Sequence, residues 1–427
     1  MSVEKDQLYE MEITKLGDSG EGIGSYKGMN IFVGGGVVGD FVKVKITGIK
    51  KTYAMGRVVK LIQASKLRTE PVCPYFRTCG VCQIMNMDYQ KGQLSFKQGV
   101  VVNALSQFEG LKETKVLPIL GMRMPLRYRN MALYTVGQGN VGIKLGFHEK
   151  GSHKVVDVQD CLLQNVSHIK INQVIREFIT EFNIQTYDEG SHKGLIRQIL
   201  IRESDVTGDL MVVFVLNGRQ IPKDSILVER LLEAVPEIKS IIINENTLKA
   251  SRCLGPNNRV ISGDETILNK MGNVEFAISP QMDFPVNSLQ AEVFYRTIFG
   301  FAGLKGEETV AQLYDANHVL TAILAQKTSS AVGATEIPKL LEEGTPIDVL
   351  MIEPTKKGCD AEKIETILKL APQKMIYISG KPSIMARDLN AICESGLYEV
   401  KKVQAVDLFA MMTNVDCIAL IEKKLVY

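Results

Sequence analysis

The sequence has no apolar run near the roughly 18 residues needed to cross a membrane, and its first ten residues, MSVEKDQLYE, carry charges throughout. It also lacks internal repeats and low-complexity segments. Hydrophobic residues make up 45% and charged residues 23% of the 427 residues, as in ordinary globular chains of two or three domains. We therefore expect a monomeric, cytoplasmic protein with no membrane partner.

Acidic residues are absent between Phe41 and Arg68, although the whole chain has a net charge of only +2. The cations of this stretch are Lys43, Lys45, Lys50, Lys51, Arg57, Lys60, Lys66 and Arg68. Runs such as DFVKVKITGIKK alternate apolar and basic residues between Gly-rich turns, which predicts a small antiparallel β-barrel of OB-like type. Closely spaced cations suit a phosphate backbone, but a solvated lysine-rich face explains the pattern equally well.

Three cysteines follow the basic stretch within EPVCPYFRTCGVCQ, where Cys73, Cys79 and Cys82 form a C-x5-C-x2-C cluster. Thiols this close in a cytoplasmic chain favour a metal centre over disulfides, and Cys161 in VVDVQDCLLQ is a candidate fourth ligand. Four thiolates hold either zinc or an iron–sulfur cluster, and buried free thiols remain the alternative. The scattered Cys253, Cys359, Cys393 and Cys417 fit core packing better.

These features occur together in one family. The basic barrel resembles a TRAM domain, and the cysteine cluster with the later DCLLQ resembles the RNA uracil-C5 methyltransferases that modify large-subunit ribosomal RNA and transfer RNA. The likeness continues through LRYRNMALYTVG, HKGLIRQILIRES and VNSLQAEVFY to VDCIALIEK near the end of the chain. The resemblance implies that Cys73, Cys79, Cys82 and Cys161 ligate a 4Fe-4S cluster and that structured RNA is the partner.

The family's reaction requires a cysteine nucleophile. A thiolate adds to carbon 6 of uracil, the resulting enolate attacks the methyl group of S-adenosylmethionine, and a base removes the proton from carbon 5. The family carries the nucleophile in a Ser-Cys-Asn-Pro turn, which here reads Ser379, Gly380, Lys381, Pro382 within MIYISGKPSIMARDL. Glycine has no side chain, so covalent addition cannot start from that position.

The family's base and cofactor positions are also altered. The base, a Glu at the end of a Phe-Pro-His-Thr-x-His-Val-Glu run, corresponds to Asp416 in FAMMTNVD. The glycines of the S-adenosylmethionine loop are absent from QLYDANH, where Tyr314 precedes Asp315, Ala316 and Asn317. We expect at most Tyr314 and Glu353 to remain as cofactor contacts, and we expect Glu336 to start a helix rather than bind ribose.

The C-terminal sheet is predicted to be shortened. EETVAQLYD and IDVLMIEP read as buried parallel strands, and the segment between them holds one crossover but hardly the three of a full methyltransferase sheet. The predicted architecture is α/β with β: a TRAM-like barrel (residues 1–66), a mostly β central domain with the cysteine site (67–262), and a shortened Rossmann-like class I methyltransferase domain (263–427). A helix near Gln90 to Phe108 is expected to pack on the last domain.

Two functions are compatible with these residues. The chain is either an RNA-binding homologue that has lost methyl transfer, with RNA contacts from Lys43, Lys45, Lys50, Lys51, Arg57, Arg127, Arg129 and Arg197, or an active uracil-C5 methyltransferase with an atypical site. A redox or iron sensor is a third, weaker reading. The first is favoured because each altered residue is one that the chemistry requires, while all four cluster cysteines are present.

Overall fold

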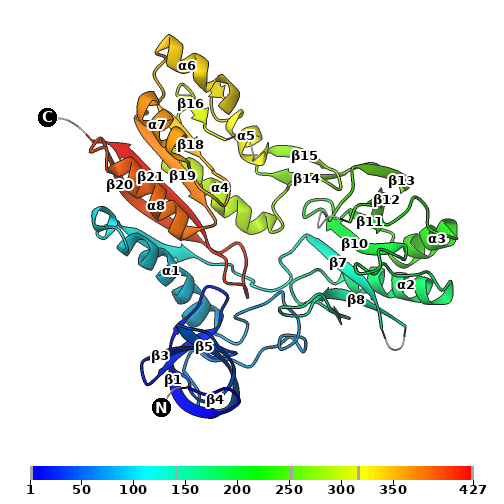
Figure 1. Cartoon of the computed structure of the whole chain (residues 1–427). Coiled ribbons are helices and arrows are strands. Elements are labelled where there is room, and N and C mark those ends of the chain that lie inside the picture. The colour runs from blue at the N-terminus through cyan, green and yellow to red at the C-terminus, as the bar shows by residue number, and fades with distance from the viewer. Residues whose placement is uncertain (1–2, 140–141, 250–252, 315–317, 425–427) are drawn as a thin grey trace. The chain divides into compact units, whose positions relative to one another are not determined.

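A computed structural model describes residues 3–139, 142–249, 253–314 and 318–424 (Figure 1). The chain divides into two compact units. The first unit contains Met1–Val72, Cys82–Arg123 and Val293–Tyr427, and the second contains Cys73–Val81 and Met124–Glu292. The boundaries predicted from the sequence at residues 66 and 262 stay a prediction. No helix in the described part of the chain is long and apolar enough to cross a membrane.

The first unit begins with the expected barrel. Its strands are β1 (Leu8–Leu16), β2 (Gly22–Tyr26), β3 (Met29–Gly34), β4 (Phe41–Ile49) and β5 (Tyr53–Gln63), closed in the order β1-β2-β3-β5-β4. The apolar residues that alternate along β4 point into the barrel, where Val42, Val44 and Ile46 are fully buried. The intervening lysines therefore point outward, which confirms the predicted inside-outside pattern.

The first unit also contains a seven-stranded sheet in the order β17-β16-β18-β19-β21-β20-β6. Its strands are β6 (Val116–Leu120), β16 (Thr309–Gln312), β17 (Ser330–Val332), β18 (Val349–Ile352), β19 (Lys374–Ser379), β20 (Tyr398–Val406) and β21 (Asp416–Lys423). The four strands from β17 to β19 are parallel, and β21 runs antiparallel to its neighbours. All four residues of β18 are buried, as expected for a parallel strand covered on both faces.

Helices cover this sheet. They are α1 (Leu94–Ser106), preceded by a π-helical turn at Tyr89–Gln93 and followed by a 3-10 turn at Glu109–Leu111, and α5 (His318–Leu324), α6 (Ile337–Glu343), α7 (Ala361–Leu370) and α8 (Pro382–Cys393). Val101 and Leu105 of α1 belong to the same apolar core as α8 and the sheet, which confirms that the early helix packs on the C-terminal fold (Figure 1).

The sheet is shortened by less than the sequence predicted. Between β16 and β18 the chain forms α5, the three-residue strand β17, a 3-10 turn at Ala334–Glu336 and α6. The expectation of a single crossover was therefore wrong, because β17 pairs in parallel with β16 on the side opposite β18. Glu336 stands where α6 begins and its carboxylate accepts a hydrogen bond from the Gly333 amide at 3.3 Å, which confirms the predicted helix start.

The second unit is built on another seven-stranded sheet, in the order β13-β12-β11-β10-β7-β8-β9. The strands are β7 (Met131–Gln138), β8 (Ile143–His148), β9 (Val155–Asp157), β10 (Ile196–Glu203), β11 (Leu210–Leu216), β12 (Ile238–Glu245) and β13 (Asn257–Gly263). The apolar run LMVVFVL forms β11, which is buried along its whole length at the centre of the sheet.

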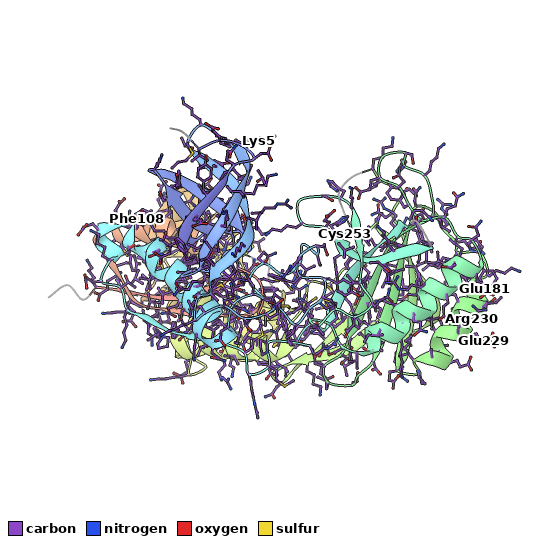
Figure 2. All side chains as sticks on the ribbon, turned by 90° about the horizontal axis from the view of Figure 1, so that it is seen from below. Lys5, Phe108, Glu181, Glu229, Arg230 and Cys253 are labelled. Carbon is purple, nitrogen blue, oxygen red and sulfur yellow. The ribbon has the colours of Figure 1, made fainter. Side chains whose placement is uncertain are left out.

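Two helices pack on the core of this sheet, α2 (Ser167–Glu181) and α3 (Asp224–Ala234). Arg230 of α3 pairs with Glu181 of α2 at 2.6 Å, and both side chains project outward in Figure 2. A hairpin of β14 (Ile267–Met271) and β15 (Val274–Ile278) follows, and α4 (Ser288–Ala302) carries the chain into the first unit.

Candidate functional site

The turn after β19 meets the start of β21 in the first unit. Because these strands are antiparallel with Ser379 opposite Cys417, Gly380 lies beside Asp416. A Cβ atom at residue 380 would stand 3.0 Å from Asp416 Oδ1. The motif resemblance predicts the family's nucleophile position at Gly380 and its base position at Asp416, and the fold brings these two residues into contact.

A cavity of about 780 Å³ opens beside this turn. Its wall is formed by Gly380 to Ser383, by Thr413 to Val415, by one face of α1 and by the β1 end of the barrel at Lys15 and Asp18. This volume falls in the range of ordinary ligand sites. The cavity is therefore large enough to hold a substrate, although residue 380 supplies no reactive side-chain atom to it.

Asp416 is half-buried and is surrounded by other charged groups. The pKa of its carboxyl group is raised to about 7: burial is the main cause, the Lys97 ammonium opposes it, and the carboxylates of Asp407 and Glu353 add to it. A carboxyl group with this pKa can accept a proton near neutral pH. The position therefore keeps the acid-base character of a catalytic base despite its shorter side chain.

A buried ion pair next to Asp416 was missed by the sequence analysis. Lys97 Nζ of α1 lies 2.6 Å from Asp407 Oδ1 and donates to the Phe409 carbonyl at 2.8 Å, and both charged side chains are 0% exposed. Tyr89 donates to the other Asp407 oxygen at 2.8 Å. A lysine in line with the buried Leu94, Val101 and Leu105 of α1 was the available signal, because charged residues seldom occupy a buried stripe without a partner.

The two expected cofactor contacts lie at one edge of the sheet. Tyr314 follows β16 and Glu353 follows β18, and these strands are parallel neighbours. The Tyr314 hydroxyl donates to Cys359 Sγ at 3.4 Å, so it serves an internal contact. Asp315, Ala316 and Asn317, the altered part of the cofactor loop, lie outside the described residues.

Two cysteines lie close enough to the site to be considered as replacement nucleophiles. Cys417 is fully buried on β21, and burial together with Asp416 raises the pKa of its thiol far above the usual range. Burial raises the pKa of Cys359 to about 11, and the side chain is only 7% exposed. Both groups are therefore protonated thiols at neutral pH, in agreement with the predicted packing role.

Three of the four predicted cluster cysteines belong to the second unit. Cys73, Cys79 and Cys161 are partly buried; the charge of Cys73 raises the pKa of Cys79, and both raise that of Cys161, which places the three in one neighbourhood. Burial is the main cause and raises the pKa of Cys161 to about 11. Cys82 belongs to the first unit. Within residues 3–139, 142–249, 253–314 and 318–424, no three potential ligands converge closely enough to hold one metal ion.

The cations of the barrel are partly neutralised. Lys43 pairs with Glu10 of β1 at 3.4 Å, and Lys45 pairs with Asp6 at 3.1 Å. Lys50, Lys51 and Arg57 are exposed and form no ion pair with any described residue. The outer face of the barrel is thus less basic than the sequence of residues 41–68 alone indicates.

The predicted RNA-binding arginines of the second unit are held by internal contacts. Arg127 forms two 2.6 Å hydrogen bonds with Asp160 and also donates to the carbonyl of Cys161. Arg197 is buried, donates to two main-chain carbonyls and stacks on Tyr187, with the guanidinium carbon 4.3 Å from the ring centre. Arg129 lies over the ring of Tyr128 at 6.0 Å. Their role in RNA binding stays a prediction.

Known proteins share both the sequence and the fold. A TRAM domain matches residues 3–59. An uncharacterized RNA methyltransferase of Clostridium tetani is 35% identical over 98% of this chain and 97% of its own length, and one of Halalkalibacterium halodurans is 32% identical over 99% and 98%. The chain therefore belongs to the family of TRAM-domain RNA methyltransferases.

A solved structure has the same fold. The tRNA (uracil-54, C5)-methyltransferase of Pyrococcus abyssi, in complex with S-adenosyl-L-homocysteine, matches with a TM-score of 0.73, covering 96% of this chain and 99% of that protein. Its sequence is 21% identical, so this likeness concerns the fold alone. The chain thus has the fold of a known protein over nearly its whole length.

Proposed function

We propose that this protein binds structured RNA, ribosomal or transfer RNA, and does not methylate it by the cysteine-addition route of the uracil-C5 methyltransferases. Gly380 carries the proposal, because it occupies the nucleophile position, faces Asp416 and has no side chain. The protonated state of Cys359 and the complete burial of Cys417 support it, since neither offers a thiolate to replace the missing one.

The same residues favour a specific alternative, an active uracil-C5 methyltransferase with a different nucleophile. Asp416 has a pKa of about 7 and sits beside a cavity that is large enough for a nucleoside. A proton acceptor at this place is useful only if a proton must be removed there. Wild-type methyl transfer that disappears in Asp416→Asn would establish this alternative and end the proposal.

The decisive experiment uses RNA that contains 5-fluorouridine. This nucleoside traps the adduct between a thiolate and the nucleobase, because fluorine replaces the carbon-5 proton that must be removed to release the enzyme. We expect wild-type protein to bind this RNA without a covalent complex on a denaturing gel, and to transfer no methyl label from S-adenosylmethionine. Gly380→Cys is expected to form the complex, after a small shift of the Asp416 carboxylate. Gly380→Ser is the matched control, because it adds an atom of similar size without a thiolate.

We also propose that Cys73, Cys79, Cys82 and Cys161 ligate a 4Fe-4S cluster. The charges of Cys73 and Cys79 both raise the pKa of Cys161, which supports a shared site, and a cubane cluster binds each ligand at a separate corner instead of drawing all of them to one ion. When bound, the cluster would cross-link these segments of chain. Arg127, which bonds to Asp160 and to the Cys161 carbonyl, holds the loop that presents Cys161.

A further inference from the structure

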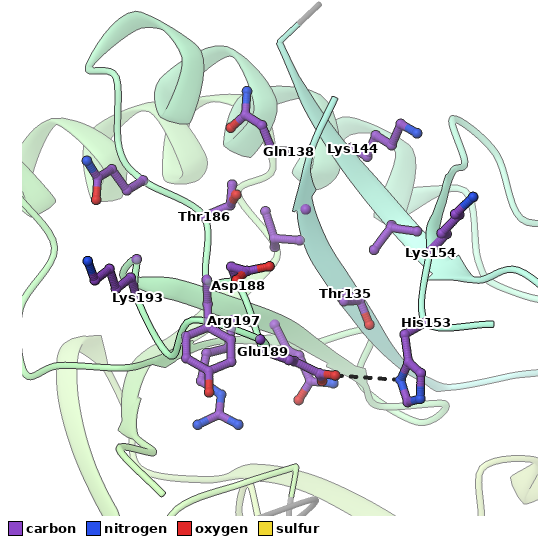
Figure 3. Close-up of a pocket in the computed structure, with 18 of the residues that line it drawn as sticks. Thr135, Gln138, Lys144, His153, Lys154, Thr186, Asp188, Glu189, Lys193 and Arg197 are labelled. Carbon is purple, nitrogen blue, oxygen red and sulfur yellow. Dashed lines mark ion pairs between the residues drawn. The ribbon is translucent and has the colours of Figure 1, made fainter. Parts of the chain in front are cut away.

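The second unit contains a cavity of about 930 Å³, whose wall includes Arg197, one of the predicted RNA contacts (Figure 3). Its walls come from β7, β8, the segment leading into β9, and the loop between α2 and β10. The volume lies near the upper end of the range for small-molecule sites. The cavity therefore has room for an extended ligand.

The side chains around the cavity leave positive charge available. Lys144 and Lys154 lie on one side and Lys193 on the other in Figure 3, and none of the three side chains has an ion pair or hydrogen bond with a described residue. The two carboxylates of the cavity are already engaged. Glu189 pairs with His153 at 3.5 Å, and Asp188 accepts hydrogen bonds from the amide and hydroxyl of Ser191.

Uncharged amide side chains also line the cavity, beside Asp188 and Glu189, which lie between the lysines in Figure 3. Asn183, Gln185 and Gln198 line the cavity, and their side-chain amides have no hydrogen-bond partner among the described residues. An amide offers two donors and an acceptor at fixed spacing, which matches the edges of nucleobases. Threonine hydroxyls of Thr135 and Thr186 add further donors and acceptors.

We infer that this cavity binds a single-stranded segment of RNA, with phosphates at Lys144, Lys154 and Lys193 and base edges at the amides of Gln185 and Gln198. A small anion would bind to only one lysine ammonium group. Lysines on opposite sides of a large open cavity can instead bind successive phosphates of one strand. Unpaired RNA is bound by cations that follow its backbone and by polar groups that hydrogen-bond to its base edges. This inference rests on the proposed RNA-binding function and locates part of it.

Fluorescence anisotropy of the full-length protein tests the inference, with a labelled single-stranded oligonucleotide and a blunt RNA duplex as probes. We expect the triple variant Lys144→Gln/Lys154→Gln/Lys193→Gln to bind the single strand at least about tenfold more weakly. The slope of log affinity against log salt should fall in magnitude by about 2, since each phosphate contact on a single strand contributes about 0.7. The control Lys170→Gln/Lys223→Gln/Lys239→Gln removes equal charge from exposed positions of the same unit.

The outcomes separate this inference from the proposed function. Equal affinities for the two triple variants would overturn the cavity assignment while RNA binding stands, and so would an equal loss of duplex and single-strand binding. No RNA binding by wild-type protein would overturn both. A second variant, Gln185→Ala/Gln198→Ala, is expected to change the ratio of affinities for oligo-uridine and oligo-cytidine without changing the salt slope, and an unchanged ratio contradicts base contact at these amides.

Discussion

Asp416 holds a carboxyl group in surroundings that favour its neutral form. Burial raises its pKa to about 7, so the folded protein keeps the proton over a pH range in which the unfolded chain has lost it. Between these two pKa values the folded state binds more protons, and its stability must fall as the pH rises. Above pH 7 the full cost of the buried charge is present.

The fall in stability with rising pH predicts how Asp416→Asn will behave. The amide cannot ionise, so the variant should melt at the same temperature as wild type near pH 4 and at a higher temperature at pH 8, with the difference growing between these values. Thermal unfolding followed by circular dichroism at a series of pH values measures it. Asp18→Asn, at an exposed residue of the same cavity, is the control. A difference in melting temperature that does not change with pH would contradict the buried-charge argument.

Local sequence was enough to identify Gly380 and Asp416, because each stands in a recognisable run beside a strand. The Lys97–Asp407 pair was not predictable, since 310 residues separate its members and only the packing of α1 on the sheet brings them together. The ion pairs of Lys43 with Glu10 and of Lys45 with Asp6 could not be predicted from the sequence for the same reason. Cross-strand register, which composition does not report, decides which cations are free.

At the scale of secondary-structure elements, the turn between β18 and α7 depends on Gly358. Its φ of +80° is unfavourable for residues with a side chain, and a Cβ atom would lie 2.5 Å from Asp388 Oδ2. Asp388 is buried, accepts hydrogen bonds from the Cys359 amide and the Tyr377 hydroxyl, and pairs with Arg387. The turn, β19 and α8 therefore meet at one carboxylate.

We predict that Gly358→Ala lowers the free energy of unfolding by more than Gly344→Ala does. Gly344 ends α6 with φ +65° and has open space around its Cβ position, so alanine there should cost about 1 to 2 kcal/mol for the left-handed backbone alone. Alanine at 358 adds the disruption of the Asp388 contacts and should cost about 2 kcal/mol more. Urea titrations of the two variants give the comparison, and equal losses would show that the contacts at 358 relax without cost.

The elements themselves were predictable to different degrees. Alternation along β4 and the continuous apolar run of β18 correctly indicated a barrel wall and a buried sheet strand. β17 was missed because three residues carry no periodic pattern. Its strand character comes from hydrogen bonds with β16, which sequence reasoning cannot see.

At the scale of the whole molecule, the proposed cluster joins cysteines that are far apart in the sequence, Cys73, Cys79 and Cys82 with Cys161. We expect protein purified without oxygen to contain iron and acid-labile sulfide in equal amounts, and Cys73→Ser/Cys79→Ser to lose both. Cys253→Ser, which changes an exposed cysteine outside the set, should keep them. Metal analysis and the visible absorption of the cluster provide the measurement. Stoichiometric zinc with little iron would exclude the cluster and leave a zinc site in its place.

Strand β6 has a consequence for how this chain is made. It leaves the ribosome well before β20, its partner in the C-terminal sheet, and the larger part of the second unit, Met124–Glu292, is synthesised between them. Through that interval the nascent chain carries an unpaired strand and the apolar face of α1 without the sheet that will cover it. The N-terminal third is thus prone to aggregation until the C-terminal sheet is made, and expression of residues 263–427 alone would leave the edge of β20 open to self-association.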